Sequence, residues 1–327
     1  MKTEMLTEFL VVMVAVFVLT VLISHFLIPV LKSKKMGQKI LEIGPRWHKS
    51  KEGTPTMGGV AFIVAILVGV AVALVIGQSE LRVILVTLAL ALLNGLVGLI
   101  DDRAKLIKKQ NEGLLAWQKY LLQFVVAGIY LFLLEVSGLI DTALVIPFTD
   151  LRIELGSGYY IFAIILITGI VNSVNLTDGI DGLASTLSLE VGGFFALAGF
   201  VFGMRSLTLL SGALIGGMIG FLVYNFHPAR VFMGDTGSLF LGGLLAGFAF
   251  ALQNPLIILL CGFVFVFEAI SVILQVMVFK LSGRKKRLFK MAPVHHHFEK
   301  CGWNEYKIVA VFSIVTLACC AVAWFGL

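Results

Sequence analysis

About ten long apolar runs dominate this sequence, each close to the roughly 20 residues that carry a helix across a bilayer. Hydrophobic residues make up 59% of the 327-residue chain and charged residues 13%, far from the composition of a soluble globular domain. The sequence therefore predicts an all-α polytopic membrane protein, with a single domain over residues 1–327. The runs lie near 8–31, 57–77, 81–100, 119–137, 159–174, 186–203, 207–224, 237–253, 255–280 and 306–326.

Lysine and arginine are concentrated on one side of this predicted bundle. They crowd the segments that follow the first, third and ninth runs, over residues 32–51, 103–119 and 284–300, and are sparse on the opposite side. Basic residues near helix ends stay in the cytoplasm. We therefore expect a multi-pass protein with both termini outside. Residues 144–155, between the fourth and fifth runs, alternate in polarity around a Thr-Asp turn and predict a short external β-hairpin.

The polar motifs all fall in connections on the predicted cytoplasmic face. Because five separate connections carry polar motifs on the same side, a single cytoplasmic site is the economical interpretation. The motifs are Gly44 to Gly59, Asp101-Asp102, Asn172 to Ser185, Asn225 to Ser238 and Pro293 to Glu299.

The connection after the fifth run carries a polar residue at every third position: Asn172, Asn175, Asp178 and Asp181. On a helical backbone this spacing gathers two amides and two carboxylates along one stripe. No lysine or arginine lies within the connection, so a metal ion or a hydrogen-bonding ligand is a natural partner. The alternative is an interhelical turn in which Asp178 caps a helix.

Three other acids match the needs of a magnesium site. Asp101 and Asp102 close the third run, where the negative end of a helix disfavours acids. Asp235 lies between Gly234 and a Thr-Gly pair before the eighth run, where free amides favour anions. Magnesium usually takes one or two carboxylates together with substrate phosphates. The alternatives are that Lys105 compensates Asp101 and Asp102 structurally, and that Asp235 only caps a helix.

Three consecutive histidines, His295, His296 and His297, follow the ninth run. They cannot all face one zinc ion from a regular element, so we interpret them as part of a loop that faces an anion. The alternative is a basic loop held against anionic lipid headgroups. Glu190 and Glu268 lie in or near apolar runs and should face the bundle interior, without an assigned role.

These motifs resemble those of bacterial phospho-N-acetylmuramoyl-pentapeptide transferases, within the polyprenyl-phosphate N-acetylhexosamine-1-phosphate transferase superfamily. The resemblance covers essentially the whole chain, and the histidine run is similar to the peptidoglycan branch in particular. It implies transfer of phospho-MurNAc-pentapeptide from UDP to undecaprenyl phosphate with Mg2+, at the cytoplasmic face of the bacterial inner membrane. A homodimer is also implied, and no nucleic-acid partner.

The resemblance also implies roles for individual residues. Asp101 and Asp102 would lie near the lipid phosphate, and Asp235 would bind the metal with Asn225 beside it. The nucleoside pocket would comprise Asn175, Asp178, Asp181 and Phe232. The remaining substrate-binding residues would be Lys51, Lys105, Lys119, Asn172, Gly234, Gln275, His295, His296 and His297.

Two other functions fit parts of the sequence. A sister enzyme that makes a GlcNAc-linked lipid would share the acidic motifs, and the histidine run argues against it. A transporter would place its polar groups near the midplane of the membrane, whereas here they gather at one interface. The sequence leaves open whether Asp101 or Asp102 acts on the lipid phosphate, and whether the acid attacks covalently or removes a proton.

Overall fold

The fold is that of a computed structural model, which describes residues 2–34, 53–76, 80–108 and 113–327. It is almost entirely helical, as predicted. The helices are α1 (Lys2–Ser33), α2 (Gly59–Ile76), α3 (Leu81–Lys108), α4 (Ala116–Val136), α5 (Gly158–Thr177), α6 (Leu183–Val201), α7 (Arg205–Asn225), α8 (Gly234–Ala251), α9 (Ile257–Cys261), α10 (Phe263–Leu281), α11 (Val294–Lys300) and α12 (Glu305–Trp324).

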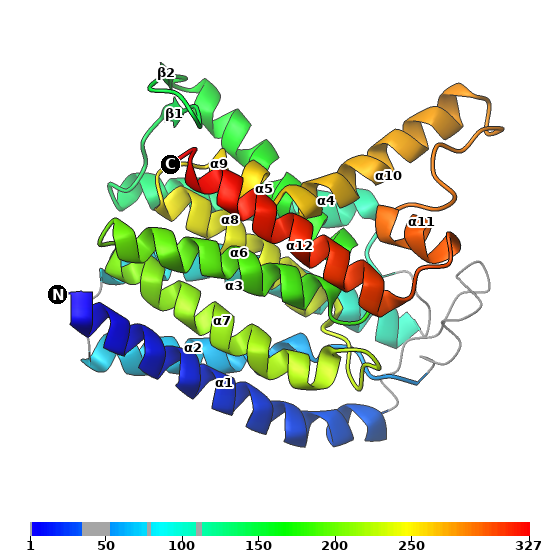
Figure 1. The fold of residues 1–327 in the computed structure, drawn as a ribbon, viewed down its shortest axis with the longest axis horizontal. Helices are drawn as coiled ribbons and strands as arrows, with labels where there is room; N and C mark the ends of the chain where they lie inside the picture. The colour runs from blue at the N-terminus through cyan, green and yellow to red at the C-terminus, as the bar shows by residue number, and fades with distance from the viewer. Residues whose placement is uncertain (1, 35–52, 77–79, 109–112) are drawn as a thin grey trace.

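The described helices confirm a polytopic membrane protein. Nine of them are long and apolar enough to cross a bilayer, and α2 is a shorter apolar helix that matches the second predicted run. The predicted hairpin is also present, because β1 (Ala143–Val145) pairs antiparallel with β2 (Arg152–Glu154). Figure 1 shows the hairpin and both chain termini at one end of the bundle and α11 at the other.

Two boundaries differ from the sequence prediction. Helix α3 does not close at Asp101-Asp102 but continues to Lys108, because its polar residues extend the helix beyond the apolar stretch. The two acids therefore do not occupy the negative end of a helix. The ninth run is not one helix but breaks at Gly262 into α9 and α10. A side chain there would lie 2.6 Å from the Ile258 carbonyl oxygen, so glycine permits this break.

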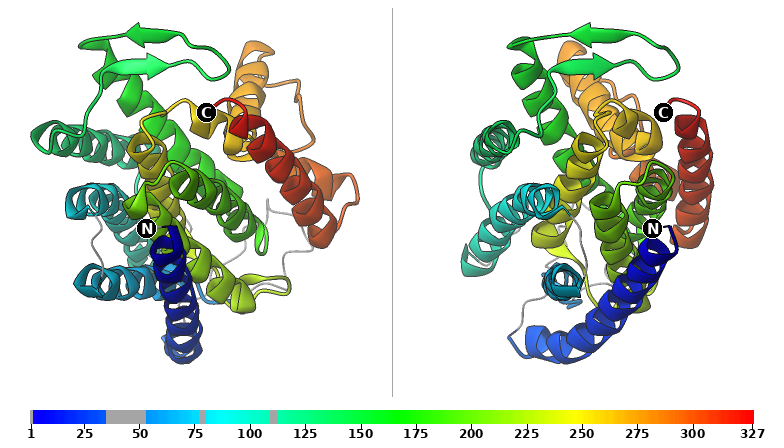
Figure 2. Two further views of the ribbon diagram at one scale, coloured as in Figure 1. Left: turned by 60° about the vertical axis from the view of Figure 1, so that its left-hand side comes forward. Right: turned by 90° about the vertical axis from the view of Figure 1, so that its left-hand side faces the viewer.

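The centre of the bundle is formed by α7 and α8, whereas α1 and α10 are the least buried of the long helices. Figure 2 shows α4 and α12 at opposite margins of the bundle. Glycines allow the central helices to approach their neighbours closely, as is common in membrane bundles. A Cβ atom on Gly98 of α3 would lie 2.1 Å from the Asp235 carbonyl oxygen of α8. This close packing holds the C-terminal part of α3 against the start of α8.

Candidate active site

Asp235 lies in the first turn of α8 and is contacted by three other helices. Its Oδ2 atom lies 2.8 Å from Lys105 Nζ of α3 and 3.0 Å from Lys119 Nζ of α4. Its Oδ1 atom accepts a hydrogen bond from Asn175 Nδ2 of α5 at 2.9 Å. Lys119 also donates to Asn175 Oδ1 at 2.9 Å. Two cations and one amide therefore converge on this carboxylate.

Asp102 caps the start of α8 from the neighbouring helix α3. Its Oδ1 atom accepts a hydrogen bond from the Asp235 N–H at 3.1 Å. Its Oδ2 atom accepts from the Thr236 N–H at 2.9 Å and from the Thr236 hydroxyl at 2.7 Å. These amides are free at a helix N-terminus, and a carboxylate is a favourable partner for them. Asp102 thus fixes the position of Asp235.

Asp101 faces the same site but accepts fewer hydrogen bonds from the backbone than Asp102 does. Its Oδ2 atom lies 2.7 Å from Lys105 Nζ, and its Oδ1 atom accepts from the Leu114 N–H at 2.8 Å. Gly113 lets this segment pass close to the acid, because a Cβ atom there would lie 2.5 Å from Asp101 Oδ1. Lys105 therefore bridges Asp101 and Asp235. It compensates the charge of Asp101, as one of the two alternatives from the sequence expected.

Carboxylate oxygens of Asp101, Asp102 and Asp235 lie within 4.8 Å of one another, which makes this group able to hold a metal ion. Three carboxylates against Lys105 and Lys119 leave one formal negative charge when all five groups are ionised. The donors are carboxylate oxygens, and this is the ligand chemistry of magnesium rather than of zinc. The residues present therefore fit a divalent, oxygen-seeking cation.

The polar stripe from Asn172 to Asp181 divides between two places, because α5 ends at Thr177 and the helical spacing ends with it. Asn172 donates to Gln123 Oε1 at 2.6 Å, and Asn175 reaches Asp235. Asp178 lies at the C-terminal cap of α5. Asp181 instead lies beside His227, whose Nδ1 is 2.9 Å from Asp181 Oδ2.

Asp181, His227 and Glu305 form a second group close enough to share a metal ion. Here, however, the polar atoms are already engaged by the protein. Asp181 Oδ2 also accepts from the Ala229 N–H at 2.9 Å, and Glu305 accepts from the Asp181 N–H at 2.9 Å. This group ties the turn between α5 and α6 to the start of α12. His227 and Glu305 are additions that the sequence did not single out.

Asn225 and Phe232 delimit the segment that leads into α8. Asn225 is buried, accepts from Ser185 Oγ at 2.9 Å and donates to the Val231 carbonyl at 3.0 Å. Phe232 is half-buried, and its backbone bonds to Pro55 at 2.9 Å and to Gly58 at 2.8 Å. Asn225 therefore holds this loop in shape rather than contacting Asp235 directly. Lys51 lies outside the described residues.

The three histidines belong to a short helix, α11, rather than to a loop, and they point to different partners. His295 is fully buried beside Glu268, with Nδ1 3.1 Å from Oε1. His296 Nδ1 lies 2.6 Å from Glu299 Oε2, and His297 Nδ1 accepts from the Lys290 N–H at 3.1 Å. Only His296 and His297 retain some exposure.

Gln275 of α10 organises the chain that leads to α11. Its Oε1 atom accepts from the Leu288 and Phe289 N–H groups at 3.0 and 2.9 Å. Its Nε2 atom donates to the Phe289 carbonyl at 3.1 Å. Both ends of this side chain are therefore used to hold the segment between α10 and α11.

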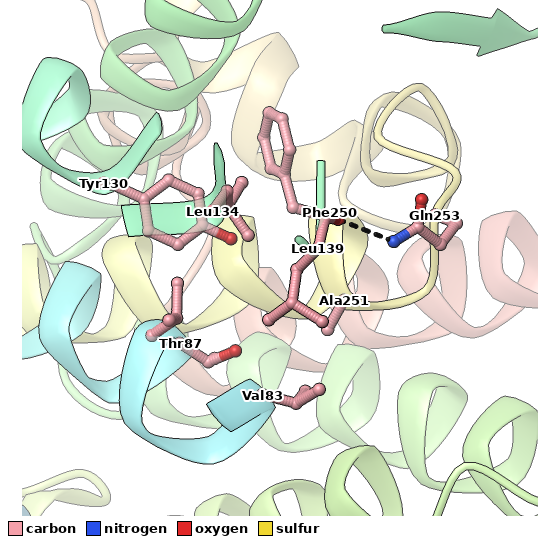
Figure 3. A pocket seen from close by; sticks show the side chains of 9 residues that line it. Val83, Thr87, Tyr130, Leu134, Leu139, Phe250, Ala251 and Gln253 are labelled. Carbon is pink, nitrogen blue, oxygen red and sulfur yellow. Dashed lines mark hydrogen bonds between the residues drawn. The ribbon is translucent and has the colours of Figure 1, made fainter. Parts of the chain in front are cut away.

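A small cavity lies at the opposite end of α3, where Figure 3 shows Thr87, Tyr130 and Phe250 around it. Gln253 closes one side by donating to the Leu139 carbonyl at 3.0 Å. Its volume of about 20 Å³ is room for roughly one water molecule. At roughly 1.5 Å per residue, Thr87 lies about 20 Å along α3 from Asp101, so this cavity is separate from the acidic site.

Two family models match the chain. The model described as Glycosyl transferase family 4 matches residues 83–253, and the one described as Phospho-N-acetylmuramoyl-pentapeptide-transferase signature 1 matches residues 51–63. The relative from Staphylococcus carnosus (strain TM300), named phospho-N-acetylmuramoyl-pentapeptide-transferase, is 44% identical over 92% of this chain and 94% of its own length. The chain belongs to the phospho-N-acetylmuramoyl-pentapeptide-transferase family.

Other members of the phospho-N-acetylmuramoyl-pentapeptide-transferase family show the same extent of similarity. The relative from Clostridium kluyveri (strain ATCC 8527) is 43% identical over 95% of this chain and 96% of its own length. The relative from Staphylococcus aureus (strain bovine RF122 / ET3-1) is 45% identical over 92% and 93%, respectively. The family 4 match contains Asp101, Asp102 and Asp235. The match to the family signature contains Pro55 and Gly58, which bond to Phe232.

Proposed function

We propose that this protein transfers phospho-MurNAc-pentapeptide from its UDP carrier to undecaprenyl phosphate, with Mg2+, giving lipid I and UMP. The overall reaction joins an oxygen of the lipid phosphate to the sugar-linked phosphorus of the donor and breaks that phosphorus's bond to the oxygen that leaves with UMP. The observation that carries the proposal is the convergence of three carboxylates and two lysines at one end of a membrane bundle, in a member of this family.

The charges of the site suit a diphosphate. When bound at Asp235, magnesium would supply positive charge to the phosphates of the donor. Lys105 and Lys119 hold their ammonium groups at Asp235 and can each exchange this contact for a phosphate oxygen. We place Asp101 at the lipid phosphate, because Asp102 is committed to the backbone of α8. Gly234 lets the chain turn next to Asp102, with φ of +72°.

The remaining predicted residues are part of the proposal as substrate contacts. Phe232 is half-buried, and we assign its ring to stacking on uracil, a contact worth roughly 1–3 kcal/mol in nucleic-acid binders. Asp178 and Asp181 belong to the turn after α5 that we assign to the nucleoside. His296 and His297 lie on α11, which we assign to the sugar and peptide. A homodimer is part of the proposal.

The lipid substrate also favours a site at the membrane surface. A long polyprenyl tail stays in the bilayer, because each buried methylene contributes about 0.8 kcal/mol, whereas the nucleotide donor is water-soluble. Their phosphates can meet only at the interface. In the described bundle the C-terminal end of α3 and the start of α8 lie at the same end as α11 (Figure 1), which we place in the cytoplasm of a bacterium.

The donor specificity is tested with purified protein, undecaprenyl phosphate and either UDP-MurNAc-pentapeptide or UDP-GlcNAc. We expect UMP release and a radiolabelled lipid product with the muramyl donor only. Chelation by EDTA should abolish both, and added Mg2+ should restore them, because the carboxylate site needs a cation to bind the diphosphate. Efficient use of UDP-GlcNAc without muramyl transfer would instead identify the sister enzyme.

The orientation is tested by cysteine labelling in a Cys301→Ser background, since Cys301 is the exposed native cysteine. Asp150→Cys at the hairpin should react in whole cells with an impermeant maleimide. Lys286→Cys, after α10, should react only after permeabilisation. Both positions are exposed in the structure. The reverse labelling pattern would invert the proposed topology.

A further inference from the structure

Glu268 is a buried carboxylate in the apolar helix α10. Its side chain is 0% exposed, and α10 buries few other residues, namely Val264, Phe265 and Ser271. A charged group inside a membrane helix is costly unless a partner compensates it. The partner here is His295 of α11, whose Nδ1 lies 3.1 Å from Glu268 Oε1 and whose backbone N–H donates to Oε2 at 3.5 Å.

The opposite edge of the His295 ring meets the turn between α5 and α6. A Cβ atom on Gly179 would lie 2.2 Å from Nε2 and 2.7 Å from Cε1 of this ring. Within the described chain, neither ring nitrogen of His295 has a hydrogen-bond partner: Nδ1 meets Glu268 Oε1 at ion-pair distance, and Nε2 contacts the turn by packing alone. The ring therefore fills the space that any side chain at position 179 would need.

Gly179 stands next to Asp178 and two residues before Asp181. Glu268, His295 and Gly179 thus form a continuous series of contacts from α10 through α11 to the turn that carries both acids. Asp181 at the far end of the turn is held by hydrogen bonds with Glu305 and the Ala229 N–H, whereas the ring of His295 packs against the turn at Gly179, beside Asp178. Helix α10 is among the least buried long helices, and Glu268 is one of its four buried residues.

We propose that Glu268 is a positioning residue for the nucleotide donor: it holds His295 against Gly179 and thereby fixes the Asp178–Asp181 turn. The inference rests on the proposed function, because that turn is the one assigned to the nucleoside. Glu268 touches no substrate in this arrangement. It acts on donor binding and leaves the polyprenyl acceptor unaffected.

The first test separates the effects on the two substrates. Glu268→Ala should raise the KM for UDP-MurNAc-pentapeptide roughly 5- to 100-fold, which lies within the range of coupling between contacting residues, with the KM for undecaprenyl phosphate unchanged. Glu268→Gln keeps an oxygen toward Nδ1 and should restore donor KM to within about 3-fold of the parent. The matched control is Glu190→Ala, which removes a partly buried acid that contacts Ser313 between α6 and α12. It should leave donor KM unchanged.

The second test uses equilibrium binding of UDP-MurNAc-pentapeptide, which needs no turnover. Gly179→Ala should weaken binding in the parent protein, because its methyl group meets the His295 ring. In a His295→Ala background the same methyl group has room, so Gly179→Ala should cause little further loss. This non-additivity is the signature of a direct contact.

Three results would overturn the proposal. The first is additive loss from Gly179→Ala and His295→Ala, and the second is a Glu268→Ala protein that binds donor normally. The third is failure of Glu268→Gln to restore binding while the protein remains folded. These outcomes are distinct from failure of the proposed function, in which the parent protein itself transfers no muramyl-peptide phosphate.

Discussion

Asp235→Asn is expected to lower turnover by roughly 10²- to 10⁴-fold while the protein stays folded. The carboxylate is the meeting point of Lys105, Lys119 and Asn175, and it begins the helix that Asp102 caps. Asparagine keeps the size and one acceptor oxygen but removes the charge. That charge is needed to hold a cation as phosphoryl charge develops, so the loss should appear chiefly in kcat and in the Mg2+ concentration required.

The measurement is initial UMP release at a series of Mg2+ concentrations, together with the thermal midpoint of the detergent-solubilised protein. Asp150→Asn, at the exposed hairpin, provides a matched control and should behave as the parent. A folded Asp235→Asn protein with near-normal, Mg2+-dependent turnover would refute the assignment of this acid to the metal.

The membrane spans could be predicted from the sequence because hydrophobicity over about 20 residues is a local property. The end of α3 could not be predicted in this way, because charged residues such as Arg103 and Lys105 can either continue a helix beyond the apolar stretch or follow its end. The break at Gly262 was also missed. It depends on how the chain packs around one glycine, and an apolar run does not reveal this.

The composition of the acidic site followed from the sequence, since Asp101, Asp102 and Asp235 each adjoin an apolar run at the same predicted face. Its internal organisation did not. The spacing of three residues predicts one helical stripe for Asn175 and Asp181, but it does not reveal that α5 ends at Thr177. In the structure Asn175 contacts Asp235, whereas Asp181 contacts His227. Likewise, three adjacent histidines gave no sign that the first would be buried by Glu268.

The pair Asp101-Asp102 shows most clearly what the structure adds. In the sequence the two acids are equivalent neighbours. In the structure, Asp102 accepts three hydrogen bonds from Asp235 and Thr236, whereas Asp101 accepts one from the backbone and contacts Lys105. Satisfied hydrogen bonds at a helix start stabilise the fold, whereas a carboxylate with spare acceptor sites beside a lysine can act on a substrate.

Asparagine substitutions at these two positions should therefore fail in different ways. Asp102→Asn would turn an amide donor toward backbone N–H groups, which should destabilise the protein by about 1–3 kcal/mol and lower its thermal midpoint. Asp101→Asn keeps an acceptor for the Leu114 N–H, so its midpoint should change little while kcat falls roughly 10²- to 10⁴-fold. Thermal unfolding and single-turnover assays on both variants separate the roles. A stable but inactive Asp102→Asn protein beside an active Asp101→Asn protein would reverse them.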